Sequence, residues 1–285
     1  MLLRSRPIVI ALLFCSLLQL TLPGRAEAAG YQLSMLPRYS TEEIYKRITP
    51  LVDYLKDSTG LAISPVLTST FDQYTKQLQS GRIAIGFENP YIYVKASKSH
   101  EAIAMAVKGA NGDKFRGIII TKTDSSIHSL ADLKGKRIAI VGYSSAGGYL
   151  SQRLTLLAAN IDVNKDCQIE EAPENKQENV VFAVFTGDAD AGFIRESALA
   201  RMEKYVPIGT IRVLARTAWL PNWALSVARS MSREDKERIV QAIQAISKDS
   251  PVLQALHIKA LRPANDRDYD PVRKAAGIMS SSTTN

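Results

Sequence analysis

The stretch from Lys136 to Asn160 carries the clearest change of hydrophobic pattern in the chain. Apolar and β-branched residues at 137–141 are typical of a strand buried in a parallel sheet, small residues fill 142–148, and apolar spacing over 149–159 is helical. A strand that passes through a Gly/Ser turn into a helix can hold an anion, because the first helical turn has free N–H groups and partial positive charge. Helix capping explains the same serines and glycines equally well.

The N-terminal part alternates between strand and helix patterns. Predicted strands lie at 31–36, 62–67 and 83–87, and predicted helices at 41–58 and 69–80. The first helix has Ser40 or Thr41 as its N-cap, and Pro50 inside it predicts a kink or two successive helices. This β-α-β-α-β order implies a parallel sheet covered by helices, in which ligands bind beyond the carboxyl ends of the strands.

Two loops are expected at that ligand-facing end. One follows the first predicted strand and contains Arg38, Tyr39 and Ser40. The other, 89–91, follows the third predicted strand and ends with Tyr91. Because the carboxyl ends of parallel strands meet at one edge of a sheet, the two loops should converge.

A second α/β pattern begins near residue 121. Further strands are predicted at 103–107, 117–121, 137–141, 166–172 and 224–228, and 187–194 is predicted to be a turn that leads into a strand. Further helices are predicted at 129–135, 149–159, 180–186 and 232–247, and the segment 212–215 is expected to carry the chain back into the first unit. The strand ending at 194 should bring the segment 195–197 to the same cleft. The predicted fold is a two-lobed α/β clamshell in which each lobe is a mainly parallel sheet flanked by helices.

The chain crosses between the two predicted lobes twice. Lobe 1 comprises 29–120 and 213–278, and lobe 2 comprises 121–212. A cleft between lobes is a common place for a small-ligand site, and hinge motion at the two crossings would close it.

Both ends of the chain depart from this pattern. Arg4 and Arg6 precede an apolar run at 8–22 and a small-residue sequence, which together predict a signal peptide over 1–28 that is cleaved near Ala28. An uncleaved membrane anchor is the alternative. The protein is therefore expected in the periplasm, and its Ser/Thr-rich tail, 279–285, is expected to be disordered.

The charge indicates which class of partner the protein binds, and the cysteine content indicates whether a disulfide can form. The net charge of +8 is spread over the chain without a long basic block, which favours a small anion over nucleic acid. A basic surface without any partner explains the charge equally well. Cleavage would leave Cys167 as the single cysteine, so no intramolecular disulfide is expected.

The sequence contains no motif for binding a metal ion or a nucleotide. His100, His128 and His257 lie far apart in the sequence without the spacing of metal ligands, and no glycine-rich phosphate-binding motif occurs. We therefore expect no metal and no cofactor.

A serine hydrolase is the main enzymatic alternative. The sequence Gly142-Tyr143-Ser144-Ser145-Ala146 nearly satisfies the nucleophile elbow G-x-S-x-G, and His257 follows in the order that a triad needs. Against this, His257 lies in an apolar stretch and no glycine run that could form an oxyanion loop precedes Ser144. We therefore expect a protein without enzymatic activity.

Five motifs appear along the chain in an order that matches a known family. They are PLVDYL at 50–55 with TG at 59–60, GRIAIG at 81–86 with PY at 90–91, LADLKGK at 130–136, SSAG at 144–147 and FTGDADAG at 185–192. In these motifs the chain resembles the exported solute-binding proteins of ABC transporters, in particular the phosphate/phosphite/phosphonate-binding family.

The resemblance implies a type II periplasmic-binding-protein clamshell that holds a tetrahedral oxyanion at the start of a helix in lobe 2. The family's Ser-Thr-Ser-Gly pattern falls on four consecutive residues: Ser144, Ser145, Ala146 and Gly147. Ala146 replaces the third hydroxyl, and the family's acidic-proline pair and histidine are missing, which leaves the ligand's identity open. Tyr91, Tyr93 and Asp190 match further site positions of the family.

The resemblance also implies partners. A monomer would bind a small anion and deliver it to an ABC permease, or present it to a membrane sensor such as a receptor kinase. The sequence does not separate transport from sensing, because both use lobe closure as the signal.

Overall fold

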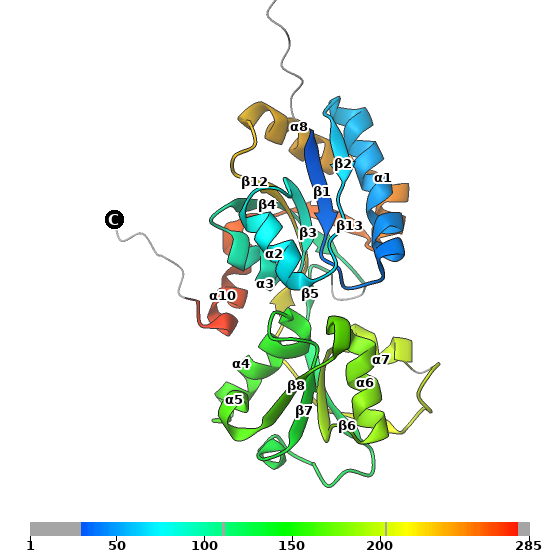
Figure 1. The fold of residues 1–285 in the computed structure, drawn as a ribbon, viewed down its shortest axis with the longest axis vertical. Helices are drawn as coiled ribbons and strands as arrows, with labels where there is room; N and C mark the ends of the chain where they lie inside the picture. Colours follow the sequence, from blue (N-terminus) through cyan, green and yellow to red (C-terminus); the bar gives the residue numbers. More distant parts are fainter. Residues whose placement is uncertain (1–29, 110–111, 203, 279–285) are drawn as a thin grey trace, which may run out of the picture.

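A computed structural model describes residues 30–109, 112–202 and 204–278, which form two α/β lobes, one above the other in Figure 1. The predicted signal peptide and the predicted disordered tail lie outside the described residues. Among the residues that are described, no helix has both the length and the apolar character needed to cross a membrane.

Lobe 1 contains a six-stranded sheet with the order β13-β4-β12-β3-β1-β2. Its strands are β1 (Tyr31–Met35), β2 (Ile63–Pro65), β3 (Ile85–Glu88), β4 (His100–Val107), β12 (Ala224–Ala228) and β13 (Ala260–Pro263). Strand β1 pairs in parallel with β2 and β3, whereas β12 is antiparallel to β3 and β4, and β13 to β4. The sheet is therefore mixed, because β12 returns from the other lobe and runs against β3.

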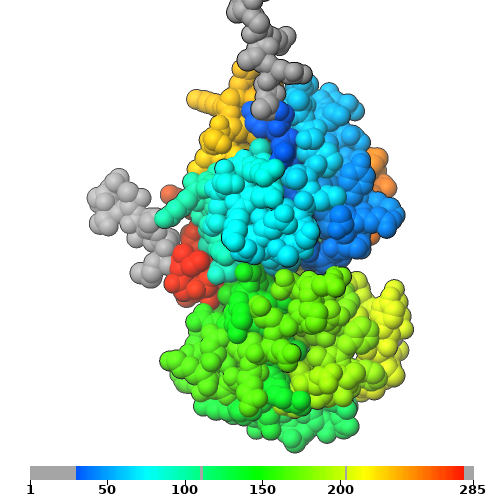
Figure 2. Space-filling model, viewed as in Figure 1, coloured from blue at the N-terminus to red at the C-terminus, as the bar shows by residue number. Residues whose placement is uncertain are grey.

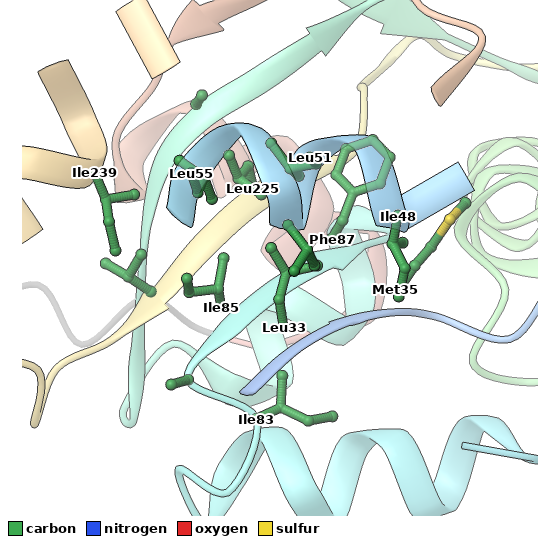
Figure 3. Packing of buried hydrophobic residues seen from close by; sticks show 14 of the residues in the cluster. Leu33, Met35, Ile48, Leu51, Leu55, Ile83, Ile85, Phe87, Leu225 and Ile239 are labelled. Carbon is green, nitrogen blue, oxygen red and sulfur yellow. The ribbon is translucent and has the colours of Figure 1, made fainter. Parts of the chain in front are cut away.

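The helices of lobe 1 cover this sheet. They are α1 (Thr41–Thr59), α2 (Phe71–Gln79), α3 (Pro90–Ala96), α8 (Arg233–Gln244), α9 (Pro251–Leu256) and α10 (Asp270–Ala276). Helix α1 lays Ile48, Leu51 and Leu55 over the core residue Leu33 of β1 (Figure 3). Ser40 caps α1, as predicted, and the helix continues through Pro50 as one element, so the alternative of two helices is wrong.

The segment after β3 is a helix and not the predicted loop. The Asn89 side chain accepts hydrogen bonds from the N–H groups of Tyr91 and Ile92, at 2.9 and 3.0 Å, and so caps α3. Pro90 is the first residue of the helix, where its missing N–H costs nothing.

Lobe 2 contains a five-stranded mixed sheet with the order β10-β6-β9-β7-β8. Its strands are β6 (Gly117–Lys122), β7 (Arg137–Ile140), β8 (Gln168–Glu171), β9 (Ala191–Arg195) and β10 (Ile211–Arg216). Strand β7 is parallel to β8 and β9, and β6 is antiparallel to β9 and β10. The helical segments are η1 (Ala131–Leu133), η2 (Ala146–Leu150), α4 (Ser151–Ala158), α5 (Val163–Asp166), η3 (Pro173–Asn175), α6 (Gln177–Thr186) and α7 (Glu196–Met202).

The two crossings lie side by side. Short strands β5 (Lys114–Phe115) and β11 (Leu220–Pro221) pair antiparallel where the chain leaves and re-enters lobe 1. Because β6 and β10 both belong to the second sheet, the chain changes sheets near residues 116 and 217, a few residues outside the predicted boundaries. The lobes meet along a seam in the space-filling view (Figure 2).

Candidate functional site

A cleft of about 480 Å³, including its opening to solvent, lies between the lobes. Lobe 1 contributes residues that follow β1 and β3, and lobe 2 contributes the start of η2 and the end of β9. The polar residues that line it are Arg38, Tyr39, Asn89, Ser145, Asn175, Gln177, Glu178 and Arg195. The aromatic rings of Phe71, Phe115 and Trp223 also line it.

The lobe 2 wall is the start of a helical segment. Ser145 is the N-cap, and its hydroxyl accepts a hydrogen bond from the N–H of Gly148 at 3.1 Å. One wide π-helical turn, η2, then leads into α4. Within the described residues, the N–H groups of Ala146 and Gly147 have no hydrogen-bond partner, and both residues line the cleft. Such N–H groups can bind an anion.

Gly147 is at a point of close approach. A Cβ atom at this position would lie 2.8 Å from Phe115 Cε2 and 3.2 Å from Arg195 Cβ. A side chain here would therefore push the aromatic ring and the arginine away from the helix start.

We expect Gly147→Ala to lower ligand affinity about tenfold or more while the protein stays folded, because the shift falls on the lining of the cleft. Titration calorimetry on the variant measures the affinity, and circular dichroism checks the fold. An unchanged affinity would show that the close packing at Gly147 has no part in binding.

The cleft holds a buried arginine without a carboxylate partner. Arg195, at the end of β9, is 8% exposed, and its Nη2 donates a hydrogen bond to Asn222 Oδ1 at 3.2 Å. Its guanidinium lies 4.1 Å from the centroid of the Phe115 ring. Burial, with a smaller contribution from the charge of Arg38, lowers the pKa of Arg195 to about 9. In the part of the chain that the structure describes, no Asp or Glu forms an ion pair with it.

Two further cations lie near Arg195: Arg38 lines the cleft with it, and Lys108 lines a neighbouring pocket to which both arginines also belong. Burial lowers the pKa of Lys108, just after β4, to about 8, and Arg38 and Arg195 act in the same direction. Burial alone would raise the pKa of the Tyr39 hydroxyl, but Arg38, Lys108 and other cations lower it. Arg38, Lys108 and Arg195 line one pocket without an ion-pair partner among the described residues, so the potential there is expected to be positive.

The structure brings together five of the predicted ligand residues. Arg38, Tyr39, Ser145, Ala146 and Gly147 all line the cleft, although they come from different lobes. The segments after β1 and β3, which were predicted to converge, both reach the cleft through Arg38, Tyr39 and Asn89.

The other five predicted site residues lie elsewhere and have structural partners. Ser40 caps α1, and Tyr91 lies in the first turn of α3, with its ring packed against hydrophobic clusters. The Tyr93 hydroxyl donates to Asp266 at 2.7 Å, and Asp190 pairs with Arg137 at 2.8 Å.

The fifth of these residues, Ser144, touches the opposite lobe through its backbone. Its carbonyl accepts a hydrogen bond from Asn89 Nδ2 at 3.2 Å, which links α3 of lobe 1 to the turn before η2. Its side chain does not line the cleft.

Sequence reasoning placed Arg195 near the cleft but missed Lys108 and Asn222. Lys108 directly follows a predicted strand, so its position at a strand end was an available signal. Asn222 lies between two tryptophans in an irregular segment, and no pattern marked it.

The geometry required of a hydrolase is not found. His257 is the C-cap of α9 in lobe 1, and within the described residues no hydrogen bond joins it to Ser144 or Ser145. The Ser145 hydroxyl instead caps the helix. Within residues 30–109, 112–202 and 204–278, no three His, Cys, Asp or Glu side chains group as a metal site.

A protein-family model matches most of the chain. A family model described as ABC transporter, phosphonate, periplasmic substrate-binding protein covers residues 33–269. The matched range includes both lobes, both crossings and the whole lining of the cleft.

Solved structures share the architecture. XAC2383 from Xanthomonas citri, bound to chloride ion, is 19% identical with a TM-score of 0.74 over 87% of this chain and 96% of that chain. PhnD1 from Prochlorococcus marinus, in complex with methylphosphonate, is 12% identical with a TM-score of 0.75 over 87% and 97%. A binding protein component of an ABC phosphonate transporter from Pseudomonas aeruginosa is 17% identical with a TM-score of 0.69 over 86% and 84%. At these identities the likeness establishes the fold.

Proposed function

Because the chain belongs to the phosphonate family of ABC transporter periplasmic substrate-binding proteins, we propose that it captures a phosphonate- or phosphate-like oxyanion between its lobes. The family consists of substrate-binding components and not of enzymes. The observation that carries the choice of an anion is the group of three cations, Arg38, Lys108 and Arg195, without carboxylate partners among the described residues.

The oxyanion would lie at the helix start. The N–H groups of Ala146 and Gly147, which have no partner among the described residues, would donate hydrogen bonds to its oxygens. The guanidinium of Arg195 would neutralise its charge. A buried cation without a counter-ion destabilises the ligand-free protein, because its desolvation is not compensated. A bound anion would supply that compensation, which favours binding. Ala146 brings no hydroxyl, so backbone and guanidinium donors replace the side chain expected there.

Lobe closure would complete the site. The hydrogen bond from Asn89 to the Ser144 carbonyl joins the lobes beside the cleft, and the paired strands β5 and β11 form the natural hinge. The closed form would then deliver its ligand to an ABC permease, which the family's role in transport favours over a membrane sensor. We also propose that the protein is exported through its N-terminal segment and acts as a monomer.

Titration calorimetry tests this function directly. The panel is methylphosphonate, phosphite, phosphate and sulfate, with an uncharged amide and a small cation as controls. We expect binding of at least one tetrahedral oxyanion and none of the controls. If only the uncharged or cationic solute bound, the assignment to oxyanions would be wrong while the clamshell fold would stand.

A further inference from the structure

A second pocket adjoins the cleft on its lobe 1 side. It has about 310 Å³ of space and shares four lining residues with the first: Arg38, Tyr39, Arg195 and Trp223. The two pockets therefore adjoin along these four side chains.

Basic side chains dominate the polar lining of this pocket. Arg38, Arg47, Lys108 and Arg195 line it, and no Asp or Glu does. Arg47 is neutralised by Glu43 at 2.6 Å, but the other three form no ion pair within the described residues. The charge of a single oxyanion at the helix start would leave part of this positive charge without a counter-ion.

Asn222 provides an independent sign of a missing ligand group. It lines the second pocket, is 2% exposed, and its Oδ1 accepts hydrogen bonds from Arg195 and from the Trp223 N–H at 3.2 and 3.0 Å. Its Nδ2 is buried without a partner among the described residues. An unpaired buried donor is costly, and an acceptor on a ligand would satisfy it.

The rest of the second pocket is apolar. Phe87, Leu256 and Ile258 line it together with the Trp223 ring. Such walls suit a short hydrocarbon linker between two charged groups, and they give no hydrogen bonds to water or to a sugar-like chain of hydroxyls.

We propose that the ligand carries two anionic groups: a tetrahedral oxyanion at the helix start, and a second anionic group beside Lys108 and Asn222. This inference rests on the proposed function and narrows it to organic phosphonates or phosphate esters with a second acidic group. Lys108 is then a specificity-determining residue that contacts the distal group. The shared residues Arg38 and Arg195 line both pockets, so they can contact either anionic group.

A matched pair of ligands tests this inference. 3-Phosphonopropionate and its carboxamide differ only in the second charge, and calorimetry at pH 7 compares their affinities. We expect the acid to bind at least tenfold more tightly than the amide. In Lys108→Met the acid should lose that advantage, with the affinity for the amide nearly unchanged, and Lys108→Arg should keep it.

Lys46→Met is the control for a lost positive charge. Lys46 lies on the exposed face of α1, where it pairs with Glu42, away from both pockets. The control should bind both compounds as the wild type does.

The possible failures are distinct. If the wild type bound acid and amide equally, the second anionic site would be wrong, and the oxyanion function would remain. Equal loss of both compounds in Lys108→Met would also overturn the inference, because Lys108 would then act on the phosphonate end. If neither compound nor any inorganic oxyanion bound, the proposed function would fail, and this inference with it.

Discussion

Arg195→Met is expected to lower the affinity for an oxyanion about 100-fold and to stabilise the ligand-free protein. The guanidinium is the most buried cation of the cleft, and a charged hydrogen bond to a ligand contributes roughly 1.5–3 kcal/mol. Methionine keeps an unbranched apolar stem beside Phe115 but removes a charge that no carboxylate among the described residues balances. The unfolding temperature without ligand should therefore rise by about 2–4 °C, which corresponds to about 1 kcal/mol.

Two measurements separate these effects. Calorimetry gives the affinity, and a thermal melt with and without ligand gives the stability. Arg216→Met is the matched control, because Arg216 lies in the same lobe but pairs with Glu196 and is largely exposed. It should change neither quantity appreciably. A variant Arg195→Met that was less stable yet bound with wild-type affinity would show that the guanidinium serves the fold and not the ligand.

The wild-type protein is expected to become less stable as pH rises, and Glu88→Gln is expected to abolish this pH dependence. Glu88 ends β3, is fully buried, and accepts a hydrogen bond from the Tyr74 hydroxyl at 2.8 Å. Burial raises the pKa of its carboxyl to about 8. The unfolded chain releases this proton near pH 4.5, whereas the folded protein keeps it to about pH 8. The free energy of unfolding therefore falls as pH rises through this window, and the loss is complete above it.

Between pH 6.5 and 8 this carboxyl is expected to make the largest contribution to the pH dependence. Burial lowers the pKa of His100 to about 4 and also lowers the pKa of His257, so these protons affect stability mainly near and below pH 6.5. Burial lowers the pKa of Lys108 to about 8, so Lys108 acts mainly from about pH 8 upward. Denaturant titrations should show the wild type losing roughly 1.5 kcal/mol across the range, since one pKa unit corresponds to about 1.36 kcal/mol. Glu88→Gln should stay level. A wild-type curve without this slope would mean that Glu88 is ionised in the folded protein.

Local features of the sequence predicted most of the elements. Ser40 and Gly60 bound helix α1 because a capping hydroxyl and a left-handed glycine act within a few residues of the chain. The run at 137–141 and the helical spacing after it anticipated β7 and α4 for the same reason. The loop predicted after β3 was wrong for an equally local reason, because Asn-Pro can start a helix as readily as a turn.

Local sequence patterns could not predict how the strands pair in the sheets or which residues form the cationic pocket. Whether β12 runs parallel or antiparallel to β3 depends on how the chain returns from the other lobe, which alternation of apolar residues does not encode. Tyr93 and Asp190 have the residue types of ligand contacts, but their positions in the fold give them Asp266 and Arg137 as partners.

The start of the helix at Ser145 was identified by sequence alone as a place for an anion, because free N–H groups and small residues are local properties. The sequence also determined the two α/β patterns and, through its motifs, the family. Only the tertiary structure brought Arg38, Lys108 and Arg195 together, since they come from three strand ends in two lobes. Electrostatic interactions depend on distance in space and not along the chain, so the charge of the cleft became apparent only when the lobes were in place.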